Sequence, residues 1–186
     1  MKLFIAILFD KQTQRFIYSQ YSQYITSDNI KFINFERPEK LHITIKYIGE
    51  TKENLIDEIY KILDNAVKYL NIKRFQLQIG GEFGVFPNIH NPRVFWLSAQ
   101  DDTNNLANLF ELLNNEFVKF EIKKEARNFT PHITLARIKN PKAYAKLKIS
   151  DNLPIQTKKI KVDSIAIMES IKGEYKLLKK CELAND

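Results

Sequence analysis

The sequence predicts an α+β protein made of two similar halves, in which helices cover one face of mostly antiparallel sheets. Alternating and β-branched apolar segments are interspersed with segments of helical period, and no long linker separates them. The pentapeptide at 41–45 (LHITI) recurs at 131–135 (PHITL), and a long amphipathic segment neighbours each copy. We therefore expect one bilobal domain over residues 1–186 rather than a solenoid.

The elements of the first half follow from apolar periodicity. In chain order we expect a strand over 3–9, a helix over 12–24, strands over 31–35 and 40–48, and a helix over 51–70. The last of these is strongly amphipathic, and Thr51 is its expected N-cap.

The second half repeats the alternation of strands and helices. We expect strands over 75–79 and 93–99, a helix over 103–117, a strand over 129–138, and a closing pair of strands over 161–168 and 175–183. Glycine, proline and asparagine predict a loop over 83–92, and Lys172-Gly173-Glu174 predicts the turn of the closing pair.

Composition limits the function. The 186 residues carry a net charge of +7, which indicates an anionic partner such as nucleic acid, a phosphate ligand or a membrane surface, or else a lysine-rich solvated surface. The single Cys181 excludes a disulfide framework and fits a reducing compartment. The first apolar run stops at Asp10, which favours a buried strand over a signal peptide, and no apolar stretch reaches the roughly 18 residues of a membrane span. We expect a cytoplasmic protein.

The repeated pentapeptide points to catalysis. Residues two apart in a strand share a face, so each copy pairs one imidazole with one hydroxyl, His42 with Thr44 and His132 with Thr134. Two imidazoles can act as general base and general acid on one bond, while the hydroxyls donate to phosphate oxygens. A single such pair is usually structural, but two matching pairs favour phosphodiester cleavage. Without a carboxylate partner at ligand spacing, the histidines make an incomplete zinc site.

At these residues the chain resembles the 2H phosphoesterase superfamily, and within it the RNA 2′,3′-cyclic phosphodiesterases, also called 2′-5′ RNA ligase-like proteins. The resemblance runs nearly end to end. It is carried by the segments 3–7, 41–50, 86–87, 92–97, 129–137, 167–170 and 173–175.

The resemblance implies a fold and a reaction. The fold is two antiparallel β-sheets forming a V-shaped cleft, with helices packed on the outside. The reaction is hydrolysis of RNA 2′,3′-cyclic phosphate ends to 2′-phosphomonoesters, without metal or other cofactor and with weak 2′-5′ ligation as its reverse. In it His42 protonates the leaving 3′ oxygen and His132 activates water, while Thr44, Thr134 and Arg137 bind the substrate. The implied partner is RNA with a cyclic phosphate end, such as a tRNA fragment, or a small nucleotide. No membrane is involved, and we expect a monomer.

Other residues carry weaker expectations. Strict alternation puts Arg137 on the face opposite Thr134, so its role requires a bend at the strand end, and Arg127 is a second candidate cation. Base stacking could come from Phe86, Phe129 or Tyr47, although each also suits a core. We expect Trp96 to lie in the core and His90 to lie exposed in a loop.

Two other functions remain open. One is the same chemistry on a nucleotide-sized cyclic phosphate or a 2′-5′ oligonucleotide, which would depend little on salt. The other is a non-catalytic RNA-binding module, whose affinity would survive loss of both histidines.

Overall fold

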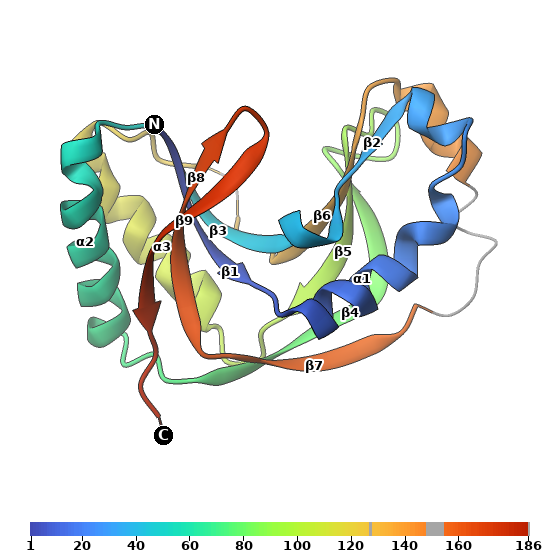
Figure 1. Ribbon diagram of the computed structural model, residues 1–186. Helices are drawn as coiled ribbons and strands as arrows, with labels where there is room; N and C mark the ends of the chain where they lie inside the picture. Colours follow the sequence, from blue (N-terminus) through green and yellow to red (C-terminus); the bar gives the residue numbers. More distant parts are fainter. Residues whose placement is uncertain (127, 148–154, 186) are drawn as a thin grey trace.

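The computed structural model of the protein describes residues 1–126, 128–147 and 155–185 (Figure 1). Within them three α-helices occur, α1 (Lys11–Tyr21), α2 (Ile56–Tyr69) and α3 (Asn105–Glu116). Short 3₁₀ helices lie at Ser22–Tyr24, Asn29–Lys31, Pro38–Lys40, Glu53–Leu55, Phe117–Phe120 and Pro141–Leu147. No helix in these described ranges is long and apolar enough to cross a membrane.

Nine strands form one antiparallel sheet among the described residues. They are β1 (Lys2–Leu8), β2 (Ile33–Phe35), β3 (His42–Glu50), β4 (Phe75–Phe86), β5 (Val94–Gln100), β6 (His132–Ile138), β7 (Thr157–Val162), β8 (Ser164–Ile171) and β9 (Glu174–Glu182). Their order is β7-β4-β5-β6-β3-β1-β8-β9, with β2 also paired to β6. The predicted α+β class is confirmed, but one sheet stands where two were expected, because β3 and β6 pair directly.

All three helices pack on the same apolar core. Ile17 of α1, Leu63 of α2 and Leu109 of α3 belong to one buried cluster with Ile43 and Ile133 of the sheet. In Figure 1, α2 and α3 lie together beside one part of the curved sheet, and α1 lies beside another. The opposite face of β3 and β6 is therefore left uncovered by helices, and the histidine side chains lie there.

Two helix starts differ in how they are capped. Asp10 caps α1, since its carboxylate accepts the backbone N–H of Thr13 at 2.7 Å. The expected N-cap role of Thr51 is wrong: Leu55 precedes α2, and the Thr51 hydroxyl donates to the carbonyl of Gly49 at 3.2 Å. A short 3₁₀ turn thus separates Thr51 from the helix that its position suggested.

Two expected elements are also divided differently. Strand β4 continues to Phe86, so the loop expected over 83–92 is shorter and begins only at Pro87. The strand continues past an irregularity at Gly80 and Gly81, both of which have positive φ. The strand expected over 161–168 is two strands, β7 and β8, that change direction at Asp163. Strand β7 is a sheet edge.

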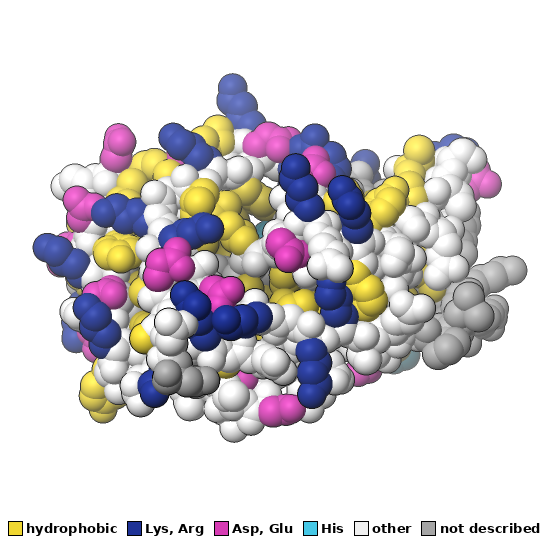
Figure 2. Space-filling model, turned by 60° about the horizontal axis from the view of Figure 1, so that its bottom comes forward, with side chains coloured by type: hydrophobic (Ala, Val, Ile, Leu, Met, Phe, Trp, Pro, Cys, Tyr) yellow, Lys and Arg dark blue, Asp and Glu magenta, His cyan; other side chains and the backbone are white. Residues whose placement is uncertain are grey.

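The edge position of β7 explains the lysine cluster at 158–161. Charged side chains on an edge strand discourage pairing with a second chain. Figure 2 shows lysine and arginine side chains interspersed with acidic ones over the face it draws, rather than gathered into one block. On this face the basic side chains are therefore distributed as on an ordinary solvated surface and form no single binding patch.

Each His-x-Thr strand carries a β-bulge directly after its threonine, and β3 has a second irregularity between Tyr47 and Gly49. Opposite β3, Ala6 of β1 pairs with Thr44 and Ile5 pairs with Lys46, so Ile45 is skipped. Opposite β6, Trp96 of β5 pairs with Thr134 and Phe95 pairs with Ala136, so Leu135 is skipped. The extra residue makes two consecutive side chains point inward. Both strands accordingly show the same burial sequence, with the fourth and fifth residues buried and the sixth exposed.

The bulge turns Lys46 into the interior. Its side chain is 0% exposed, and its ammonium group donates to Asn114 at 2.8 Å and to Glu125 at 3.2 Å. Asn114 in turn exchanges two hydrogen bonds of 2.9 Å with the backbone of Glu125. This network ties the segment after α3, which leads to β6, to the middle of β3.

We predict that the Lys46–Glu125 pair is costly to break from one side. Glu125→Ala leaves the buried ammonium with two neutral partners only, the Asn114 amide and the Lys123 carbonyl, and should lower the free energy of unfolding by about 2–3 kcal/mol. Lys46→Met removes the buried charge and should stay within about 1 kcal/mol of the native protein, because Glu125 lies partly in solvent. Urea unfolding checks both variants.

The control is Glu116→Ala, which removes an exposed ion pair to Lys119 and should change stability by less than about 0.5 kcal/mol. Equal losses in Lys46→Met and Glu125→Ala would contradict the interpretation.

Candidate active site

The two His-x-Thr strands meet at a single pair, Ile43 opposite Ile133, in antiparallel register. This register brings His42 alongside Thr134 and Thr44 alongside His132. Both isoleucines are buried in the core, so the histidines and threonines occupy the other face. The four predicted side chains therefore lie together at the centre of the sheet.

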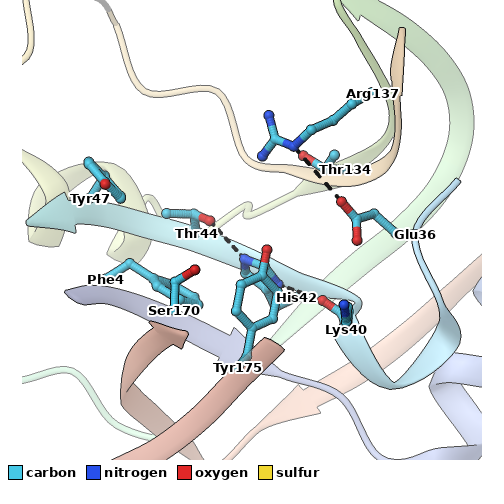
Figure 3. A pocket seen from close by; sticks show the side chains of 10 residues that line it. All are labelled: Phe4, Glu36, Lys40, His42, Thr44, Tyr47, Thr134, Arg137, Ser170 and Tyr175. Carbon is cyan, nitrogen blue, oxygen red and sulfur yellow. Dashed lines mark hydrogen bonds and ion pairs between the residues drawn. The ribbon is translucent and has the colours of Figure 1, made fainter. Parts of the chain in front are cut away.

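Two connected hollows lie over this face. A small one of about 160 Å³ contains His42, and a larger one of about 680 Å³ contains His132. The two hollows have four lining residues in common, namely Thr44, Tyr47, Thr134 and Arg137. Figure 3 shows the smaller hollow, with side chains from β3, β6 and the segments around them directed into it.

The histidines are oriented by the same backbone contact. His42 Nδ1 lies 2.7 Å from the carbonyl of Lys40, and His132 Nδ1 lies 2.7 Å from the carbonyl of Thr130. A carbonyl oxygen can only accept, so Nδ1 carries the proton in both rings. Nε2 is therefore the nitrogen left for acid–base work, and in His42 it accepts the Thr44 hydroxyl at 3.0 Å.

Aromatic rings flank both imidazoles. The His42 ring lies 5.0 Å from Phe4 and 5.1 Å from Tyr175, between ring centroids. The His132 ring lies 4.9 Å from Phe86 and 6.3 Å from Trp96. Each ring is thus held edgewise or tilted against aromatic neighbours, which limits its rotation.

The expectation that Trp96 lies in the core is wrong. Phe95 and Leu97 take the buried positions of β5, so alternation turns Trp96 toward the face that carries the histidines. There it packs against Phe86, and it covers Gly84 so closely that a Cβ at Gly84 would lie 2.0 Å from the indole ring.

Arg137 reaches the site because of the bulge in β6. The extra residue reverses the alternation, so Arg137 points to the same face as Thr134 and lines both hollows. The bend that its role required is therefore present. Tyr47 holds the equivalent place in β3 and is 53% exposed. Arg127, the second candidate cation, lies outside the described residues.

The remaining candidates are divided. Phe86 and Phe129 line the larger hollow, where Phe129 is stacked on Phe110 at 5.1 Å. His90 is exposed in the loop between β4 and β5, as expected. Among the described residues, no group of three or more histidine, cysteine, aspartate or glutamate side chains could hold a metal ion.

The imidazole of His42 in the smaller hollow binds a proton less readily than an exposed histidine. Burial is the main cause that lowers the pKa of His42; the charges of His132 and Arg137 lower it further, and the bond to the Lys40 carbonyl opposes them. Without a bound anion, His42 therefore favours its neutral form.

One carboxylate shares this hollow. Glu36 Oε1 lies 3.9 Å from Arg137 Nε, and burial raises the pKa of Glu36 against the lowering effect of Arg137, Lys40 and Arg37. Glu36 thus partly balances the positive charge that would meet a phosphate.

Sequence reasoning missed several residues of the smaller hollow, namely Phe4, Glu36, Lys40, Ser170 and Tyr175. They come from β1, β8, β9 and the segment before β3, and only long-range strand pairing brings them together. Phe4, Ser170 and Tyr175 fall in segments that carry the family resemblance, but their local patterns assign none of them to a site.

The chain is similar to known proteins over most of its length. The family model of the 2′-5′ RNA ligase superfamily matches residues 31–174. An RNA 2′,3′-cyclic phosphodiesterase of Methanocaldococcus jannaschii is 32% identical over 139 residues, which cover 75% of this chain and 72% of the relative. One from Thermotoga maritima is 34% identical over 150 residues, 77% of this chain and 76% of the relative.

Solved structures share the fold. A Thermus thermophilus protein superposes with a TM-score of 0.74 at 24% identity, over 100% of both chains. Escherichia coli LigT in complex with 3′-AMP superposes with a TM-score of 0.74 at 19% identity, over 98% of this chain and 97% of that one.

We predict that the pKa of His42 lies below the ordinary histidine value of about 6.5. Inorganic phosphate should raise this pKa, because its negative charge stabilises the buried imidazolium ion. Between the lowered pKa and about 6.5 the unfolded state binds more protons, so stability should fall as the pH drops through this window. NMR titration of the imidazole checks this, with His42→Gln to assign the signal. A free-state midpoint above 6.5 would contradict the assignment of burial as the dominant cause.

Proposed function

The chain belongs to the 2′-5′ RNA ligase superfamily, and we propose that it hydrolyses the 2′,3′-cyclic phosphate ends of RNA to 2′-phosphomonoesters. The observation that carries this proposal is the matched pair of histidines, each with Nδ1 on a backbone carbonyl, at the two ends of one groove. Relatives of 32% and 34% identity bear the name of this activity.

The two histidines divide the proton transfers. His132 Nε2 takes a proton from water as its oxygen bonds to phosphorus, and His42 Nε2 gives a proton to the 3′ oxygen as the bond from phosphorus to that oxygen breaks. The product keeps the phosphate on the 2′ oxygen. No metal enters the scheme, and the assignment of acid and base follows the family resemblance.

The state of His42 fits the role of an acid used only with substrate. In its neutral form His42 keeps its proton on Nδ1, so Nε2 cannot donate to the leaving oxygen, and burial favours that neutral form before the substrate binds. The anionic cyclic phosphate beside His42 raises its proton affinity, so protonation and substrate binding support each other.

The threonines and Arg137 hold the phosphate. The hydroxyls of Thr44 and Thr134 lie in both hollows, and Arg137 lies beside them. Hydroxyl donors and a guanidinium stabilise the negative charge that develops on the non-bridging oxygens. Thr44 must then release His42 Nε2 when the substrate enters, since that nitrogen serves the leaving oxygen.

The larger hollow accommodates the nucleoside. Its wall includes Phe86, Phe129 and Tyr47, whose rings offer stacking surface to any base, and Arg93 lies at its edge. We propose that the chain acts as a monomer and as one functional domain, since both histidines come from one chain. Ligation through a 2′-5′ bond is the reverse of the same step, and water at about 55 M outcompetes it.

We predict metal-independent turnover of a short RNA with a 2′,3′-cyclic phosphate end, measured in EDTA with identification of the product as 2′- or 3′-phosphate. His42→Ala and His132→Ala should each lower kcat by about 10²–10⁴, because each removes one proton transfer. Thermal unfolding of each variant shows whether the fold is kept.

His90→Ala is the matched control, since His90 is exposed in the loop between β4 and β5 and lines neither hollow, and it should turn over like the native protein. Absence of turnover by the native protein, or release of a 3′-phosphate, would overturn the proposed reaction. Full activity in either histidine variant would remove that residue from the mechanism.

A second prediction concerns the size of the substrate. If one or two phosphates beyond the reacting one are held, for instance by Arg93, raising salt from about 50 to 200 mM should increase KM for RNA relative to KM for a cyclic mononucleotide by about three- to sevenfold. Parallel kinetics on both substrates measure this ratio. An unchanged ratio would favour nucleotide-sized cyclic phosphates as the substrate class.

A further inference from the structure

The hairpin of β8 and β9 brings a tyrosine to the smaller hollow. Its two-residue turn is Lys172-Gly173, both with positive φ, and Ile171 pairs with Glu174 on either side of it. Tyr175, the second residue of β9, is half-buried, and its ring packs edgewise on His42 at 5.1 Å.

The hairpin turn is held to the segment before β3 by charged contacts, which we call the latch. Arg37 donates to both carboxylate oxygens of Glu174 at 2.6 Å, and Lys40 Nζ lies 3.0 Å from the same carboxylate. Lys40 also donates to the carbonyl of Gly173. The Lys40 carbonyl is the group that orients His42, so the latch joins the hairpin to the imidazole itself.

The Tyr175 hydroxyl faces the place where a phosphate would lie. Figure 3 shows its oxygen directed toward Thr44 and Arg137, and Tyr175 lines the same hollow as both. Within the described parts of the chain, no hydrogen bond to this hydroxyl is made. A half-buried hydroxyl donor without a partner inside an anion site is available to a ligand.

The chemistry of the group suits a phosphate oxygen. Burial and the nearby carboxylate of Glu36 raise the pKa of Tyr175, so the phenol stays protonated and can donate. A neutral hydroxyl that donates to an anionic oxygen forms a charge-assisted hydrogen bond, which is stronger than a bond between neutral groups.

We infer that Tyr175 is a further phosphate-binding residue, whose hydroxyl donates to a non-bridging oxygen of the substrate and which the Arg37–Lys40–Glu174 latch holds in place. The inference rests on the proposed function for the identity of the substrate. It concerns a hydrogen bond that is made on binding and kept as charge develops on the phosphate.

The test is Tyr175→Phe, which keeps the ring that packs on His42 and Phe4 and removes only the hydroxyl. We expect kcat/KM for the cyclic-phosphate RNA to fall about 10- to 100-fold. We also expect the dissociation constant for inorganic phosphate, measured by calorimetry, to rise at least about fivefold. Thermal unfolding should be unchanged. Tyr18→Phe, on the exposed side of α1, is the matched control and should behave as native.

The outcomes separate the two claims. Native turnover that Tyr175→Phe retains within twofold, with unchanged phosphate affinity, overturns the role of Tyr175 and leaves the proposed function standing. Without native turnover the proposed function fails, and the phosphate measurement alone then decides whether Tyr175 binds an anion. If the native protein neither reacts with the RNA nor binds phosphate, both claims fail.

The latch has its own test through a double-mutant cycle. Glu174→Gln weakens the contacts to Arg37 and Lys40, and we expect it to lower kcat/KM several-fold in the native background and by less in Tyr175→Phe, where only the effect through Lys40 and His42 remains. The exposed ion pairs contribute little to stability, so thermal unfolding should barely move. Equal losses in both backgrounds would show that Glu174 acts independently of the hydroxyl and would overturn the positioning part of the inference.

Discussion

The pairing of Ile43 with Ile133 is the contact on which the site depends. It joins two strands of the same local sequence in antiparallel register, so the isoleucines enter the core while His42 and His132 emerge on the other face. A slip of one residue would turn every side chain of one strand to the wrong face and bury a histidine. The apolar core therefore enforces the relative position of the two histidines that we propose as the acid and the base.

The matched bulges add what simple alternation cannot supply. In both strands the bulge follows Thr by one residue and returns the side chain three positions after Thr to the site, Tyr47 in β3 and Arg137 in β6. The chain uses the two equivalent places differently, one for an aromatic ring and one for a cation. The interior positions also differ, since Lys46 reaches across to the segment that leads to β6, whereas Ala136 only fills space.

The bulges and the strand pairing separate what can be predicted from the sequence from what cannot. Periodicity located both His-x-Thr strands and all three α-helices within a few residues, because each has a one-sided apolar pattern. It misjudged Trp96 and the start of α2, and it divided β7 and β8 incorrectly, because burial there depends on which strand lies alongside. Arg137 was doubtful for the same reason: a bulge leaves only a faint mark, two adjacent inward residues, in the sequence. Tyr175 falls in a segment that carries the family resemblance, but its local pattern assigns it no role, since its position beside His42 results from pairing between strands that are far apart in the chain.

The electrostatics of the site follow from this assembly. Strand pairing buries His42 beside a second histidine and an arginine, an environment that disfavours the imidazolium ion. Glu36 offsets part of the positive charge, but it lies 3.9 Å from Arg137 and so also competes with a ligand for that guanidinium. An anionic phosphate would both neutralise the charge of Arg137 and stabilise the protonated form of His42. His42 is thus a poor acid before the substrate binds, and the substrate itself completes the charge balance that the proposed reaction needs.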